Sequence, residues 1–189
     1  MILASSSPRR AEILRDIGLR FRVVIPDVDE KRLVGESPRR YVRRLALDKA
    51  RQVAERYPHE WVVAADTTVV VGDTVFGKPR DSRQARRMLR DLSGRSHVVL
   101  SGVAVARLST PIRRAAVSRT RVFFRKLTRV DIDRYVKTGE PNDKAGAYGI
   151  QGKGALLIQR IEGSYTNVVG FPLETFLSLW QSVHGPRLF

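Results

Sequence analysis

The apolar run at residues 61–71, W-V-V-A-A-D-T-T-V-V-V, is the segment that most constrains how this chain can fold. Its Val-rich composition, between Pro58 and the Gly72-Asp73 pair, predicts a buried strand or paired strands, with a turn at Gly72-Asp73. Asp66 lies in the middle of the run. A buried carboxylate is costly unless it is paired, bound to a metal or facing a cleft. Asp66 is therefore a candidate functional acid, with a turn or cap aspartate as the alternative.

Segments that predict strands and helices alternate along the whole chain. Strands are expected near residues 1–4, 21–25, 61–71, 74–76, 97–107, 115–124 and 155–161. Helices are expected after the capping residues Ser7, Ser37, Ser82 and Thr128, with a last helix near 172–183. The alternation predicts an α/β fold, and the hairpins predict a mixed sheet.

Length and composition predict one domain, residues 1–189, with a substantial core. The sequence contains no cysteine, which excludes disulfides, thiolate metal sites and cysteine nucleophiles. No stretch approaches about 20 apolar residues, and residues 1–4 are too short for the apolar region of a signal peptide. We therefore expect a cytoplasmic protein.

The formal net charge of +16 leaves two interpretations open. One is a protein that binds nucleic acid or another polyanion. The other is an arginine-rich surface around a small site for an anionic substrate. The basic residues occur in scattered pairs, such as Arg39-Arg40 and Arg86-Arg87, and no zinc finger, basic zipper or RNP-like aromatic motif accompanies them.

Several short segments have the chemistry of a phosphate site. The stretch S-S-S-P-R-R at residues 5–10 places two arginines at a predicted helix start, where an anion or an ordinary cap would be compatible. The acidic cluster at residues 27–30, which includes Asp29, predicts either a site for a hard cation such as Mg²⁺ or a solvated turn. Lys49 lies on or beside the apolar face of its helix, and Lys78 is held between Gly77 and Pro79.

Six motifs in the same order along nearly the whole chain resemble the Maf family of nucleotide pyrophosphatases. They are S-S-S-P-R-R at 5–10, A-D-T at 65–67, G-K-P at 77–79, L-S-G-R-S-H at 92–97, K-A-G-A-Y-G-I-Q-G at 144–152 and S-Y-T-N-V-V-G-F-P-L at 164–173. The resemblance implies hydrolysis of a nucleoside triphosphate to its monophosphate and pyrophosphate, with a divalent cation, Mg²⁺ or Mn²⁺. It also implies a homodimer. The implied fold is an elongated mixed α/β sheet with flanking helices and two lobes around a deep cleft, and this architecture is related to that of the inosine triphosphate pyrophosphatases.

The resemblance also assigns roles to individual residues. Asp66 matches the proton acceptor, and Asp29 falls where the family carries a metal-site or active-site carboxylate, often Glu, so that Asp29 and Asp66 are the implied metal ligands. The implied substrate-binding residues are Arg9, Lys49, Thr67, Lys78 and Gln151.

Arg9, Thr67 and Gln151 fit the branch of the family that acts on dTTP and UTP. The sister branch, which acts on 7-methyl-GTP, typically has D-Q in place of D-T and E-G in place of Q-G. We therefore expect a pyrimidine triphosphate, modified ones included, as the substrate. A purine or methylated-purine triphosphate and a basic nucleic-acid-binding protein are the alternatives. Tyr148 is either a residue that stacks on the base or a structural tyrosine.

Overall fold

The computed structural model describes residues 1–72 and 74–188. Asp73 of the expected Gly72-Asp73 turn lies outside these residues, although the hairpin around it is present. The strands that flank the turn, β3 (Val62–Val71) and β4 (Thr74–Phe76), pair antiparallel, with Val69 opposite Phe76.

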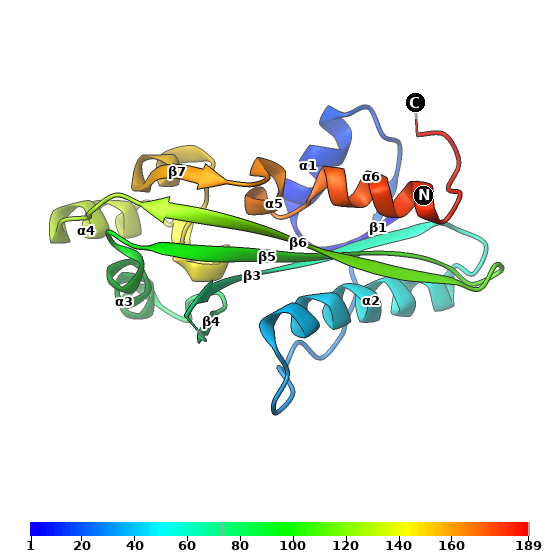
Figure 1. Cartoon of the computed structure of the whole chain (residues 1–189), viewed down its shortest axis with the longest axis horizontal. Helices are drawn as coiled ribbons and strands as arrows, with labels where there is room; N and C mark the ends of the chain where they lie inside the picture. Colours follow the sequence, from blue (N-terminus) through cyan, green and yellow to red (C-terminus); the bar gives the residue numbers. More distant parts are fainter. Residues whose placement is uncertain (73, 189) are drawn as a thin grey trace. The chain divides into compact units, whose positions relative to one another are not determined.

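A mixed seven-stranded sheet runs through the described chain in the order β2-β1-β3-β5-β6-β7, with β4 paired to β3 outside that path (Figure 1). The short strands β1 (Ile2–Ala4) and β2 (Arg22–Val24) are parallel to each other, and β1 is also parallel to β3. The remaining strands are β5 (Ser96–Arg107), β6 (Ile112–Phe124) and β7 (Ile158–Glu162), and β6 and β7 are antiparallel. The predicted mixed α/β fold with flanking helices is thus confirmed.

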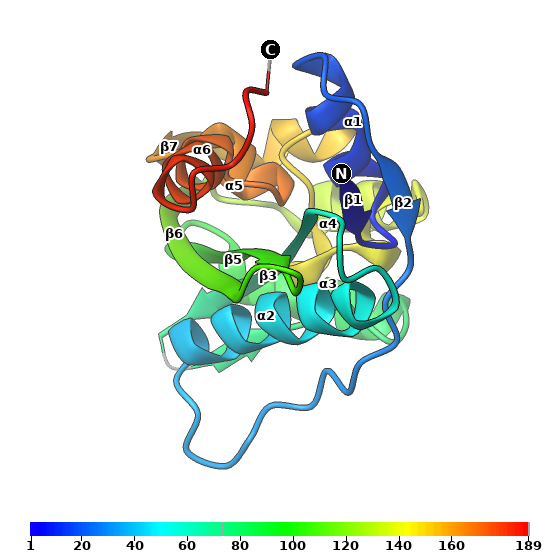
Figure 2. The same ribbon diagram turned by 90° about the vertical axis from the view of Figure 1, so that its right-hand side faces the viewer.

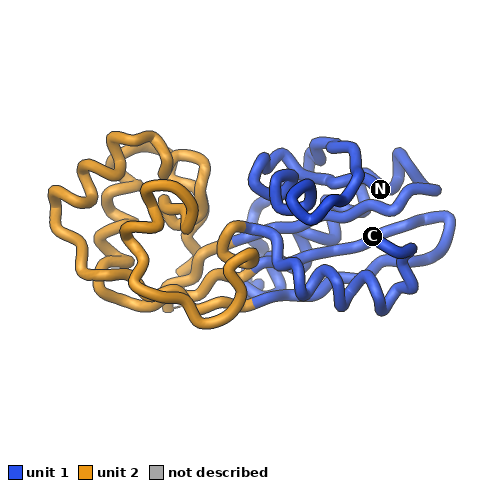
Figure 3. The backbone as a smooth tube through the Cα atoms, turned by 90° about the horizontal axis from the view of Figure 1, so that it is seen from above, with its two compact units in different colours: residues 1–67, 101–118, 170–189 blue, residues 68–100, 119–169 orange. Residues whose placement is uncertain are grey.

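The chain divides into two compact units, drawn in different colours in Figure 3. Unit 1 contains residues 1–67, 101–118 and 170–189, and unit 2 contains residues 68–100 and 119–169. Three of the four divisions fall inside β3, β5 and β6, and the fourth falls between residues 169 and 170. Whether residues 1–189 behave as one domain stays a prediction.

Unit 1 contains the helices α1 (Pro8–Asp16), α2 (Pro38–Arg56) and α6 (Leu173–Ser182). Helix α2 covers one face of its strands, and α1 and α6 lie on the other face (Figures 1 and 2). Small side chains allow α2 to approach the sheet closely. At Gly102 on β5, a Cβ atom would lie 2.1 Å from the carbonyl oxygen of Val42 on α2. The approach is possible because residue 102 has no side chain.

Unit 2 packs α3 (Ser82–Leu92) and α4 (Arg129–Lys137) around a core that includes Leu89, Val122 and Tyr135. The glycine-rich stretch that follows α4 contains the 3₁₀ turns η1 (Glu140–Asp143), η2 (Ala145–Ala147) and η3 (Gly152–Leu157). The short helix α5 (Tyr165–Val169) follows β7.

Most predicted helix starts are confirmed, and two boundaries are corrected. The hydroxyl of Ser37 accepts a hydrogen bond from the Arg40 N–H, and Thr128 with Asp131 forms a capping box. The cap of α3 is Asp81, whose carboxylate accepts from the Gln84 N–H; Ser82, predicted as the cap, is the first helical residue. The last strand begins at Ile158, later than predicted, because residues 152–157 form η3. In the part of the chain that is described, no helix combines the length and apolar character needed to cross a membrane.

Candidate active site

A buried ion pair between Asp66 and Lys49 lies at the centre of the candidate site in unit 1. Asp66 belongs to β3 and is only 7% exposed, so the alternative of a turn or cap aspartate is wrong. The Lys49 Nζ atom lies 2.7 Å from Asp66 Oδ1, and Lys49 is also only 7% exposed. Lys49 points inward because it shares the buried face of α2 with residues such as Ala46 and Ala50. The positive charge of its ammonium group offsets the unfavourable free energy of removing the Asp66 carboxylate from water.

A second carboxylate, Glu30, contacts the same ammonium group. The distance from Lys49 Nζ to Glu30 Oε1 is 2.7 Å. Nearby, the Tyr41 hydroxyl donates a hydrogen bond of 2.8 Å to the Glu30 carbonyl oxygen. The pKa of Tyr41 is raised to about 12, chiefly because burial disfavours the phenolate, and secondly because of the negative charges of Asp66 and Glu30.

Glu30 was not among the residues predicted for the site. The resemblance pointed to its neighbour Asp29, which is exposed and whose carboxylate accepts a 2.9 Å hydrogen bond from the Lys31 N–H. The acidic cluster at residues 27–30 was recognised in the sequence, but the spacing does not reveal which of its carboxylates reaches Lys49. A metal role for Asp29 stays a prediction.

Arg10 joins three segments of unit 1 beside Asp66. Its Nε atom donates a hydrogen bond of 2.9 Å to the Gly170 carbonyl oxygen. Its two terminal nitrogens donate hydrogen bonds of 3.2 Å to Ser5 Oγ and 3.3 Å to Thr67 Oγ1. The Thr67 hydroxyl also lies 2.8 Å from Ser101 Oγ. Burial lowers the pKa of Arg10, and the nearby Asp66 carboxylate opposes that shift. Sequence reasoning selected Arg9 and missed this role of Arg10, although both belong to S-S-S-P-R-R.

The other predicted site residues are distributed between the two units. Thr67 adjoins Asp66 on β3, and Arg9 precedes Arg10 on α1, where it is half-buried. Lys78 and Gln151 belong to unit 2, and both are exposed. Lys78 follows β4, and Gln151 immediately precedes η3.

Tyr148 has a structural role in unit 2. It is buried, its hydroxyl lies 2.6 Å from His97 Nε2, and its ring packs edge-on against Phe124. Burial raises the pKa of Tyr148 and lowers the pKa of His97 to about 4. The alternative in which Tyr148 stacks on a nucleotide base is therefore not supported. These contacts hold the segment that carries Gln151.

The carboxylates around Lys49 fit the requirements of a divalent cation that shares its coordination with a phosphate group. Within residues 1–72 and 74–188, no cluster of three or more His, Cys, Asp or Glu side chains could hold a metal alone. Mg²⁺ is, however, usually held by one or two carboxylates, together with water and substrate phosphates. Asp66 and Glu30 converge on one cationic nitrogen, so they form a pair of the required kind.

Comparison with solved structures defines the fold class. The structure of the Ham1 protein from Staphylococcus aureus superposes with a TM-score of 0.56 over 97% of this chain and 96% of that chain, at 12% sequence identity. At this identity the likeness shows a common α/β fold alone.

Sequence comparison then identifies the family. A family model described as "Maf-like protein" matches residues 1–183, and the chain belongs to the Maf family. Relatives named "dTTP/UTP pyrophosphatase" include a Symbiobacterium thermophilum protein, 55% identical over 92% of this chain and 89% of its own length. The corresponding proteins of Anaeromyxobacter dehalogenans and Myxococcus xanthus are 53% and 50% identical, each over 98% of this chain and 95% and 93% of their own lengths.

Proposed function

We propose that this protein hydrolyses dTTP and UTP, and modified pyrimidine triphosphates of similar shape, to the monophosphate and pyrophosphate. The observation that carries the proposal is the Asp66–Lys49–Glu30 cluster, in which the buried Lys49 ammonium group lies 2.7 Å from the buried Asp66 carboxylate and 2.7 Å from the exposed Glu30 carboxylate. Family membership and relatives named for this activity at 50–55% identity support it.

Asp66 is the proposed general base. Cleavage between the α- and β-phosphates needs a water molecule delivered to the α-phosphorus, and a positioned carboxylate that orients it and accepts its proton typically contributes about 10²–10⁴-fold. Lys49 is within hydrogen-bond distance of Asp66 and fixes the position of that carboxylate. In the proposed reaction, Arg9, Lys49 and Lys78 neutralise the triphosphate and the pyrophosphate leaving group.

Asp66, with Glu30 or Asp29, is the proposed ligand set for Mg²⁺ or Mn²⁺, which is completed by phosphate oxygens of the substrate. The convergence of Asp66 and Glu30 on Lys49 favours Glu30 over Asp29 as the second ligand. When bound, the cation would polarise the phosphoryl oxygens and lower the pKa of a bound water.

Arg9, Thr67 and Gln151 are the proposed determinants of substrate choice. Thr67 contributes to the shape of the pocket because its hydroxyl already lies within hydrogen-bond distance of Arg10, Ser101 and the Gly170 carbonyl oxygen. Gln151 is exposed and carries an amide, which can donate to and accept from the edge of a pyrimidine. A homodimer and a cytoplasmic location stay predictions.

A panel of nucleoside triphosphates tests the proposal. dTTP, UTP, modified pyrimidines, ATP, GTP and 7-methyl-GTP are each incubated with the protein and Mg²⁺, Mn²⁺ or a chelator, and released pyrophosphate is measured. We expect the pyrimidines to be the best substrates and the chelator to abolish release. A preference for 7-methyl-GTP or another purine triphosphate would support the alternative substrate class. If none of the triphosphates released pyrophosphate, the proposed reaction would be wrong.

A further inference from the structure

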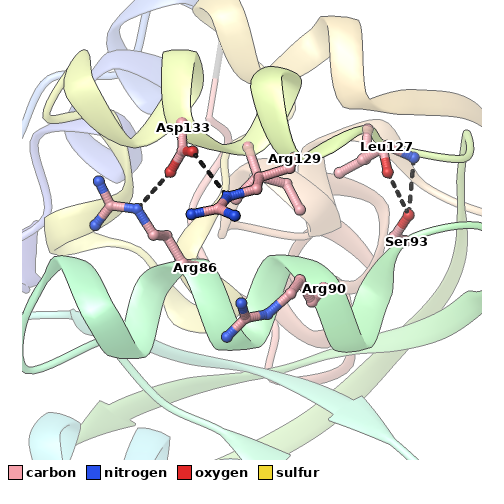
Figure 4. Close-up of a pocket in the computed structure, with 7 residues that line it drawn as sticks. Arg86, Arg90, Ser93, Leu127, Arg129 and Asp133 are labelled. Carbon is pink, nitrogen blue, oxygen red and sulfur yellow. Dashed lines mark hydrogen bonds and ion pairs between the residues drawn. The ribbon is translucent and has the colours of Figure 1, made fainter.

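A hollow in unit 2 is lined by none of the residues assigned to the proposed reaction. It measures about 550 Å³, and it lies between α3 and α4. Figure 4 shows Arg86 and Arg90 projecting from α3 and Arg129 and Asp133 from α4. The volume is within the range of about 300–1,000 Å³ that is typical of small-ligand sites.

The lining of the hollow carries an excess of positive charge. Three guanidinium groups face one carboxylate, Asp133, which accepts a hydrogen bond of 2.6 Å from Arg86 Nε and lies 3.8 Å from Arg129 Nε. The contact with Arg86 is the main reason that the pKa of Asp133 is lowered. Among the described residues, no hydrogen bond or ion pair satisfies the Arg90 guanidinium group. Arg86 also donates a hydrogen bond of 3.0 Å from Nη1 to the Ser82 carbonyl oxygen. Asp133 and this carbonyl oxygen together still leave most of the N–H donors of the three arginines available.

A hydroxyl group adds to this set of donors. Ser93, at the end of α3, accepts a hydrogen bond of 2.8 Å from the Leu127 N–H. The Ser93 hydroxyl donates in turn to the Leu127 carbonyl oxygen, but the distance from Ser93 Oγ to that oxygen is 3.5 Å, at the limit of a hydrogen bond. The Ser93 O–H is thus able to donate to a ligand in the hollow without breaking a strong internal bond.

The chemistry of the lining selects one class of ligand. Planar guanidinium forks match the oxygens of phosphate groups, and a hydroxyl donor complements them. Binding of single-stranded nucleic acid ordinarily adds aromatic side chains on which bases stack, and the described residues that line this hollow include none. We propose that the hollow between α3 and α4 binds a small phosphate-bearing anion, either a free phosphate or pyrophosphate ion or the phosphate end of a nucleotide, through Arg86, Arg90, Arg129 and Ser93.

The test uses the full-length protein and inorganic pyrophosphate as the probe. Arginine side-chain N–H signals are followed by NMR during titration at constant ionic strength, with the signals of Arg86, Arg90 and Arg129 assigned by substitution. We expect these signals to shift saturably, and Arg90→Ala to weaken pyrophosphate binding at this site about five- to tenfold, the amount typical of one charge-assisted contact. Arg87→Ala, on the same helix and outside the hollow, is the matched control and should bind normally.

Further arms distinguish the possible sources of the phosphate. Inorganic phosphate and dTMP are titrated in the same way as pyrophosphate. The probe that binds with the highest affinity identifies the source of the phosphate group. The proposal is overturned if sulfate and chloride at equal charge concentration give the same shifts, or if Arg90→Ala and Arg87→Ala weaken binding equally. It is also overturned if a short single-stranded oligonucleotide shifts these signals with steep salt dependence while pyrophosphate does not. Because the readout is local to Arg90, its failure leaves the proposed reaction untouched, and loss of the reaction leaves this site untouched.

Discussion

Among single residues, the proposed function depends most on the carboxylate that is buried inside strand β3. Asp66 is stabilised in β3 by Lys49, and Lys49 also contacts Glu30. The family resemblance predicted Asp66 and Lys49 as members of one site. The sequence itself marked them as unusual, as a carboxylate in an apolar run and a lysine on or beside the apolar face of a helix. It did not distinguish Glu30 from Asp29, because the backbone of an acidic loop sets the direction of each side chain.

Substitution of the two neighbouring carboxylates tests which of them serves the site. Glu30→Gln removes the charge that lies 2.7 Å from Lys49 Nζ, and we expect it to lower kcat at least about tenfold and to weaken activation by Mg²⁺. Asp29→Asn, the matched control, should retain most of the activity because its carboxylate accepts a hydrogen bond from the Lys31 N–H, whereas the Glu30 carboxylate pairs with Lys49. Steady-state kinetics at several Mg²⁺ concentrations measure both effects. A larger loss in Asp29→Asn than in Glu30→Gln would restore the assignment implied by the family resemblance.

The buried His97 predicts a pH-dependent stability. Its folded pKa of about 4 lies below the ordinary value of 6.5 because burial disfavours the charged ring. As the pH falls from 6.5 to 4, the unfolded chain takes up a proton that the folded chain does not, so stability decreases through this window. The contribution amounts to about 3 kcal/mol. Urea unfolding of the wild type and of His97→Gln at several pH values should show curves that converge towards pH 4, whereas parallel curves would contradict this account.

At the scale of elements, close packing of α2 on the sheet determines where Lys49 lies. Gly102 allows this packing, because any side chain there would meet the Val42 carbonyl oxygen at 2.1 Å. We expect Gly102→Ala to displace α2, to reduce the free energy of unfolding by about 1–3 kcal/mol and to lower kcat. Gly77→Ala is the stability control, since a Cβ atom at residue 77 meets nothing within 4 Å. Denaturant unfolding and kinetics measure these changes, and a fully stable, fully active Gly102→Ala protein would contradict the role given to the packing.

The elements themselves were largely predictable, and their ends were less so. Proline after serine marks the starts of α1 and α2, and a Val-rich run marks the buried strand β3. Asp81 displaced Ser82 as the cap of α3, since both residues have capping side chains and only the backbone decides between them. The S-Y-T-N motif suggested function, but Asn167 is buried and its amide donates to Val99 O and Thr120 Oγ1. Its role in unit 2 is to connect strands, a contact across many residues that sequence spacing does not show.

At the scale of the whole molecule, the charge of +16 has a kinetic consequence. A field of one sign raises the rate at which anionic substrates arrive, and salt screens it over about 10 Å at 0.1 M. We expect kcat/KM for dTTP to fall several-fold between about 50 and 500 mM salt, with kcat nearly unchanged, because salt acts on encounter and not on the proton transfer. Kinetics in an inert salt at fixed free Mg²⁺ measure this. A kcat/KM that is independent of salt would show that the surface charge does not attract the substrate.

In the proposed reaction, Asp66 is the base that activates water for cleavage of the triphosphate. The most direct test of this role is pyrophosphate release from dTTP by Asp66→Asn, a substitution that keeps the size of the side chain and removes its ability to accept the proton. We expect kcat to fall about 10²-fold or more, with an unchanged circular dichroism spectrum. An Asp66→Asn protein that folds normally and releases pyrophosphate at the wild-type rate would contradict this role.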